Sequence, residues 1–202
     1  LTGVTIPDSV TTIGSSAFYY CDSLTSVYIT DLSAWCKIDF GNYSANPLSN
    51  GANLYRDNKL VTDLVIPSDI TEIKPYIFSG CISLTSVTIP DSVTTIGSYA
   101  FHGCSSLTSV YCSSLTSITI PDSVTTIGGS AFSGCTGELI VNCNSPSASS
   151  YSYGAFYGSK FTSVTIGDSV TTIGDSAFSC CSSLTSVTIP DSVTTIGVGA
   201  FY

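Results

Sequence analysis

The stretch from Leu84 to Cys104 reads Leu-Thr-Ser-Val-Thr-Ile-Pro-Asp-Ser-Val-Thr-Thr-Ile-Gly-Ser-Tyr-Ala-Phe-His-Gly-Cys, and near-copies of it fill the chain. The repeating unit is about 23 residues long, and a fixed period of about 20–50 residues predicts a solenoid whose units contact only their neighbours. We therefore expect residues 1–202 to form one elongated repeat domain of about eight turns. The copies begin at Leu1, Leu24, Val61, Leu84, Leu115, Glu138, Phe161 and Leu184.

Each copy predicts one short strand followed by a return path. In the first copy, Val4 and Ile6 alternate with polar residues as in a half-buried strand. Pro7 ends that strand, because proline has no N–H for a continuing ladder. We expect a second extended stretch at Thr11–Ile13 and a tight helical turn at Ser16–Tyr20.

Three groups of residues recur with this spacing and form a signature. They are Leu84-x-x-Val87-x-Ile89-Pro90, Val93-x-x-Ile96-Gly97 and Ala100-Phe101-x-x-Cys104. The signature resembles the BspA-type leucine-rich repeats of surface proteins from bacteria and parasitic protists, and the resemblance covers nearly the whole chain. It implies a right-handed leucine-rich repeat superhelix with short parallel strands. It also implies an extracellular or cell-surface adhesion or recognition protein without catalysis. It does not identify the ligand, because one fold serves many partners.

Residues 31–60 interrupt the repeat and read as an insert. Asp31 predicts the N-cap of a short helical turn that ends at Cys36. Asp57-Asn58 predicts the turn of a hairpin over residues 53–61. Insertions in solenoids form loops on one face, which is often a binding face.

Two interpretations of the insert's aromatic residues stay open. Either they contact a partner, since Trp, Tyr and Arg dominate interface hot spots, or Trp35 and Phe40 form a small core under the insert. Ser and Thr alternate with apolar residues along the strands and so share the outward side, which predicts a flat, uncharged hydroxyl face suited to glycan or protein. The candidate partner-binding residues are Trp35, Tyr43, Tyr55 and Arg56 in the insert and Tyr28, Thr88 and Thr119 on the strand face.

The charge balance excludes several classes of partner. Five lysine and arginine residues stand against fourteen acidic residues, for a formal net charge of −9. A nucleic-acid-binding protein needs a basic face to displace counterions, so we expect no nucleic-acid partner. No apolar run reaches about 18 residues, so we expect no membrane insertion within this chain.

Two columns of residues could carry chemistry, and for both we favour a structural role. One aspartate recurs in the turn after the strand in six of the eight copies, which indicates turn chemistry rather than a Ca²⁺ site. One cysteine recurs late in the copies, which indicates a small core residue. The aspartates are Asp8, Asp31, Asp91, Asp122, Asp168 and Asp191, and the cysteines are Cys21, Cys81, Cys104, Cys135 and Cys181.

Catalysis has no support in the sequence. His102 is the one histidine, and we expect it on the surface of an outer turn. No nucleophile elbow, phosphate loop or zinc-binding motif occurs. We therefore predict that the protein is not an enzyme and holds no cofactor or metal.

Two functions stay open at this point. The first is adhesion: a cell-surface module binding host or microbial protein or glycan through the strand face and the 31–60 insert. The alternative is a structural protein that assembles end to end into filaments. The copies at both ends carry no polar cap, and we expect either flanking sequence or self-association through these ends.

Light scattering coupled to size exclusion separates these two functions. Across about a hundredfold range of concentration, an adhesion module keeps a constant mass near 21.0 kDa. A filament former shows a mass that grows with concentration without a fixed endpoint.

Overall fold

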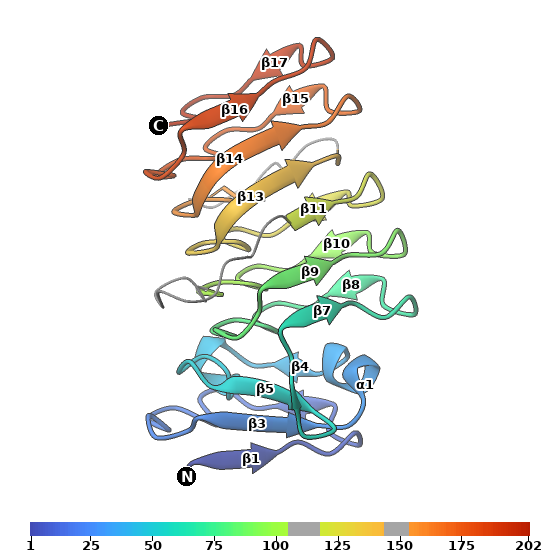
Figure 1. The fold of residues 1–202 in the computed structure, drawn as a ribbon, viewed down its shortest axis with the longest axis vertical. Helices are drawn as coiled ribbons and strands as arrows, with labels where there is room; N and C mark the ends of the chain where they lie inside the picture. The colour runs from blue at the N-terminus through green and yellow to red at the C-terminus, as the bar shows by residue number, and fades with distance from the viewer. Residues whose placement is uncertain (105–117, 144–153) are drawn as a thin grey trace.

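The chain forms a solenoid of parallel strands in a computed structural model, which describes residues 1–104, 118–143 and 154–202. Figure 1 shows the turns stacked from the N-terminus to the C-terminus, with one strand of each turn on the near side. The predicted repeat solenoid is therefore confirmed.

Nine strands on the near side of the described residues run parallel to one another. Eight belong to the eight predicted copies, and the ninth, β5, lies in the segment expected to be an insert. They are β1 (Gly3–Thr5), β3 (Ser26–Ile29), β5 (Asn53–Arg56), β7 (Asp63–Val65), β9 (Ser86–Thr88), β11 (Ile118–Ile120), β13 (Thr136–Val141), β14 (Lys160–Ile166) and β16 (Ser186–Thr188). The predicted start of the sixth copy at Glu138 is wrong by two residues, because Glu138 pairs with Ser163, the third residue of the next copy.

Shorter strands on the return path form small sheets behind these. The first confirms the extended stretch expected at Thr11–Ile13. They are β2 (Thr12–Ile13), β4 (Asp39–Phe40), β8 (Glu72–Ile73), β10 (Thr95–Ile96), β12 (Thr126–Ile127), β15 (Thr172–Ile173) and β17 (Thr195–Ile196).

The helical turn predicted at Ser16–Tyr20 is wrong. Ser16 and Tyr20 have φ angles of 62° and 59°, in the left-handed region, which a right-handed helix does not contain. The same pair of left-handed positions recurs at Tyr99 and Gly103. Backbone N–H groups in these turns alternate in direction: His102 N donates along the chain to Tyr99 O, whereas its neighbours donate to the next turn of the solenoid. For example, the Phe101 N–H donates to Ala131 O at 2.8 Å.

A continuous stack of phenylalanine rings lies inside these turns. Adjacent centroids along the stack are 4.9–5.5 Å apart. All but the last ring are buried. The rings belong to Phe78, Phe101, Phe132, Phe156, Phe178 and Phe201.

Residues 31–60 build a turn of the solenoid rather than a loop outside it. The helix α1 (Leu32–Cys36), strand β4 and a 3₁₀ turn at Tyr43–Ala45 form its return path. Strand β5 then pairs in parallel with β3, and a hairpin leads through β6 (Lys59–Leu60) to β7. Asp31 caps α1 by accepting from Ser33 N at 2.8 Å, which confirms the predicted cap.

The hairpin turn is also where it was predicted. Asp57 and Asn58 connect β5 to β6 with φ angles of 50° and 60°. Two positive φ angles in a two-residue loop match the twist of the flanking strands.

The substitution Phe132→Ala tests the phenylalanine stack. Because Phe132 is fully buried between two rings, we expect a loss of about 3–5 kcal/mol in the free energy of unfolding. Phe201→Ala is the matched control, since Phe201 has one ring neighbour in the stack and is 40% exposed. Urea unfolding followed by circular dichroism measures both, and equal losses would contradict a cooperative stack.

Candidate functional site

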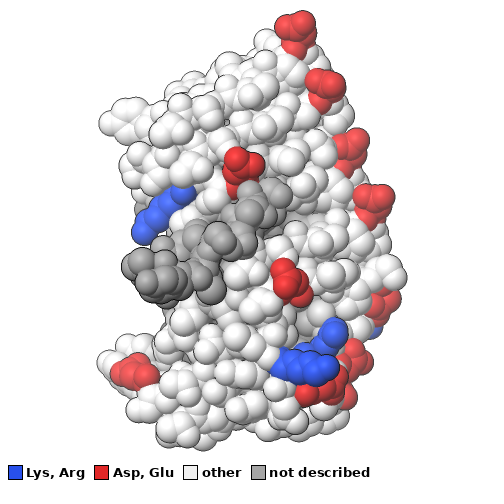
Figure 2. Space-filling model, viewed as in Figure 1, with Lys and Arg blue, Asp and Glu red and all other residues white. Residues whose placement is uncertain are grey.

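The strand register aligns one outward residue from each near-side strand into a column. Its members are Thr5, Tyr28, Tyr55, Val65, Thr88, Thr119, Ile140, Thr165 and Thr188. The column residues pair from strand to strand within each of the two near-side sheets, since the one register shift between β13 and β14 lies before them, at Gly137/Glu138. The column breaks between Tyr55 and Val65. Figure 2 shows that most of this side of the molecule carries no charge, while acidic side chains follow one edge. We call this column the outer strand face.

Tyr28 and Tyr55 form an aromatic pair on the outer strand face. Their centroids are 5.1 Å apart and their rings are tilted by 25°. They lie opposite each other on β3 and β5, so the sheet spacing itself brings the rings into contact. Both are half-buried. Beside Tyr28, a depression of about 330 Å³ is also lined by Thr5, Asp57 and Asn58.

Thr88 and Thr119 also lie side by side, as the sequence predicted for one hydroxyl face. They are register partners on β9 and β11, and both are exposed. Neither hydroxyl bonds to another described residue, so both remain available to a ligand. They line a shallow depression of about 840 Å³ together with Asp91 and Asp122.

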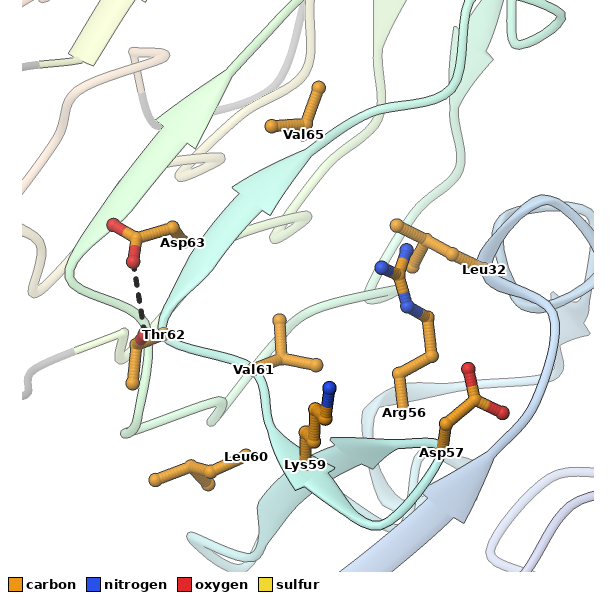
Figure 3. A pocket seen from close by; sticks show the side chains of 9 residues that line it. All are labelled: Leu32, Arg56, Asp57, Lys59, Leu60, Val61, Thr62, Asp63 and Val65. Atoms are coloured by element: carbon orange, nitrogen blue, oxygen red, sulfur yellow. Dashed lines mark hydrogen bonds between the residues drawn. The ribbon is translucent and has the colours of Figure 1, made fainter.

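Arg56 is exposed at the end of β5, next to the hairpin turn. Lys37 and Lys74 pair with Asp69 and Asp39 respectively. Arg56 and Lys59, by contrast, form no salt bridge with the described residues. Both line a groove between the hairpin and β7 (Figure 3).

The prediction that Trp35 contacts a partner is wrong. Trp35 is only 1% exposed, because α1 turns its indole into the core, where it packs on Phe40 with centroids 5.6 Å apart. The alternative interpretation, a small core under the insert, is confirmed.

Tyr43 lies on the return path, away from the outer strand face. Its hydroxyl donates to Ser49 O at 2.9 Å, and its ring meets His102 edge-on. His102 also contacts Tyr99, and it is half-buried rather than on the surface as expected. Burial lowers the pKa of His102.

The aspartate column lies in the turns that follow the strands. These turns are closed by backbone bonds, such as Val93 N to Pro90 O at 3.0 Å. The Asp8 carboxylate accepts from Thr30 Oγ1 at 2.8 Å in the next turn. Within the described residues, no three His, Cys, Asp or Glu side chains converge on a point that could hold a metal.

Val65 is a further member of the outer strand face that was not among the predicted residues. In Val61-Thr62-Asp63-Leu64-Val65-Ile66-Pro67, Val65 stands where Leu84-Thr85-Ser86-Val87-Thr88-Ile89-Pro90 has threonine. Aligning these two copies would have revealed an apolar residue in the hydroxyl column.

Known leucine-rich repeat families and structures resemble this chain. The family described as BspA type leucine-rich repeat region, with six copies, matches residues 1–44, 49–114 and 110–202. The chain belongs to the BspA-type leucine-rich repeat family. Curated proteins gave no match.

Of three similar solved structures, the first two below support the same fold. A leucine-rich repeat protein from Eubacterium ventriosum ATCC 27560 is 24% identical with a TM-score of 0.60, and the match covers 99% of this chain but 58% of that protein. The T. pallidum leucine-rich repeat protein is 21% identical with a TM-score of 0.50, over 98% of this chain and 74% of that one. A leucine-rich cell surface protein from Faecalibacterium prausnitzii A2-165 is 22% identical with a TM-score of 0.33, over 93% and 79%.

The repeated cysteines of this BspA-type chain belong to the solenoid core. The thiols of Cys104 and Cys135 donate to Phe78 O and Phe101 O of the preceding turn, at 3.2 and 3.1 Å. Cys81 is fully buried, and burial raises its pKa to about 12. The predicted structural role is therefore confirmed at these positions. In the described part of the chain, no helix is long and apolar enough to cross a membrane.

Thiol labelling tests this assignment. Burial also raises the pKa of Cys36 to about 12, and only the thiolate reacts. In folded protein at pH 8 we expect iodoacetamide to modify the exposed Cys180 at least about tenfold faster than Cys36 or Cys81. Peptide mapping by mass spectrometry measures each site, and equal rates in the folded protein would contradict the burial.

Proposed function

We propose that this chain is a non-catalytic recognition module of a cell-surface protein that binds protein or glycan through the outer strand face. The observation that carries the proposal is the Tyr28–Tyr55 pair, two stacked rings on a surface whose other members are mostly threonines. The chain spans 58% of the Eubacterium ventriosum protein, so the proposal concerns this module. The family resemblance supports the surface location.

The chemistry of the face supports a neutral ligand. Tyrosine offers an apolar ring and a polar hydroxyl, which suits both the C–H face of a sugar and an apolar protein side chain. Thr88 and Thr119 add hydroxyl groups, each able to donate and accept. Because the contacts are neutral, binding through this face depends only weakly on salt.

A regular solenoid also suits extended ligands. Successive turns repeat the same groups at a spacing of about 4.7–4.9 Å. A ligand that crosses several turns therefore meets the tyrosine pair and several threonines in sequence, and small contacts add up.

The double substitution Tyr28→Ala/Tyr55→Ala tests this function. The wild-type chain is applied to an array of host-cell glycans and extracellular matrix proteins, and we expect it to bind selected spots. Because aromatic residues dominate binding energy, the double variant should bind those spots at least about tenfold more weakly.

The matched control is Tyr19→Ala/Tyr20→Ala. These two rings are also in contact, with centroids 4.0 Å apart, but they are exposed on the return path. Binding should be unchanged in the control, and circular dichroism confirms that both variants fold. Equal binding by both variants, or no binding by the wild type, would overturn the proposal.

A further inference from the structure

The near-side strands do not form one continuous sheet. One sheet has the order β1-β3-β5-β6, and the other begins at β7 and runs through β9 to β16. In Figure 1 the chain leaves the β5–β6 hairpin and crosses a step to reach β7. The break lies inside the solenoid, between two segments of the same chain.

Strand β7 therefore has one paired edge and one free edge. Toward β9, Thr62 O accepts from Thr85 N at 2.7 Å, and Ile66 N donates to Thr88 O at 3.0 Å. A strand in a parallel pair uses alternate residues for each side. The N–H and C=O groups of Asp63 and Val65 consequently face the break, and no described strand pairs with them.

A groove of about 370 Å³ opens along this free edge. Figure 3 shows Arg56, Asp57 and Lys59 on the hairpin side, Leu32 of α1 at one end, and Asp63 and Val65 on β7. Leu60 and Val65 expose 43% and 62% of their surface. The groove thus combines unpaired backbone groups with apolar side chains, which together match an extended peptide.

The charges of the groove select among such peptides. The Asp63 carboxylate accepts from Ser86 Oγ at 2.6 Å and from Thr62 Oγ1 at 3.1 Å, and these bonds lower its pKa. Its oxygens are therefore already engaged. Arg56 and Lys59 have no salt bridge with the described residues, so an acidic side chain would complement them.

We propose that this groove binds an extended acidic segment of a partner protein, added as a strand to the free edge of β7. Main-chain bonds to Asp63 and Val65 supply affinity, and contacts with Leu60, Arg56 and Lys59 supply specificity. The proposal rests on the proposed binding function and names one class of partner for it. It uses residues other than the Tyr28–Tyr55 pair.

The probe is a fluorescein-labelled peptide, acetyl-Thr-Val-Glu-Val-Glu-Val-Thr-amide, followed by fluorescence anisotropy. We expect saturable binding below about 1 mM, as for a short β-augmenting segment. N-methylation of alternate amides on the bonding edge removes the donors and should weaken binding at least about tenfold. Replacing both glutamates with lysine should weaken it similarly.

Protein variants locate the site. Val65→Pro removes the free N–H of Val65 while keeping the groups that bond to β9, and should weaken binding at least about tenfold. Arg56→Glu/Lys59→Glu keeps the backbone and should weaken binding of the acidic peptide by a similar factor. Lys160→Glu, an exposed cation on β14, is the matched control and should bind as the wild type does.

Amide shifts in two-dimensional NMR provide a readout that does not depend on any variant. We expect the shifts to gather at residues 56–65. No binding at 1 mM, equal binding of the N-methylated peptide, or shifts confined to β1 or β16 would overturn the proposal. Tyr28→Ala/Tyr55→Ala should still bind the peptide, so failure of the groove and failure of the outer strand face are distinguishable.

Discussion

The phenylalanine stack from Phe78 to Phe201 is the constraint on which most of the solenoid depends. Rings about 5 Å apart match the spacing of hydrogen-bonded strands, so ring contacts and backbone ladders fix the same distance between turns. The close approach also explains the glycine after isoleucine. A Cβ on Gly128 would collide with the backbone of Ser98 in the preceding turn. Glycine is needed there for space, since its φ is not positive.

Because the turns are equally spaced, residues that recur in the sequence lie side by side on the surface of the solenoid. Once the turns are locked in register, one outward position of each near-side strand becomes a row, and two tyrosines on neighbouring strands stack because of that register alone. The row is interrupted where the phenylalanine stack begins. There, the buried Asn46 links the turn before the break to the turn after it. Its side-chain amide donates to Tyr76 O and Ile77 O and accepts from Leu48 N. A buried amide whose hydrogen bonds are all satisfied can stabilise the packing between two turns that share no stacked phenylalanine rings.

Much of the fold could be predicted from local sequence. The repeat and most strand positions follow from a pattern that recurs along the chain. The Asp31 cap and the Asp57-Asn58 turn follow from residues that favour these structures wherever they occur. Strand β5 was not predicted as part of the solenoid because Asn53-Leu54-Tyr55-Arg56 lacks the Pro-Asp exit that ends the strand in four of the eight copies. The sequence could not show that Trp35 is buried whereas Tyr55 points outward. Both are aromatic, and only the direction in which α1 and β5 present them decides their roles.

The break before β7 is best understood from the cost of an open strand edge. Unpaired N–H and C=O groups invite uncontrolled association, and proteins protect such edges with charges. Arg56, Asp57, Lys59 and Asp63 surround this edge with both signs of charge. An apolar strand from another molecule meets charges it cannot satisfy, whereas a strand carrying carboxylates opposite Arg56 and Lys59 is attracted. The same side chains that discourage aggregation therefore supply selectivity, because protection and recognition both act on the free groups of Asp63 and Val65.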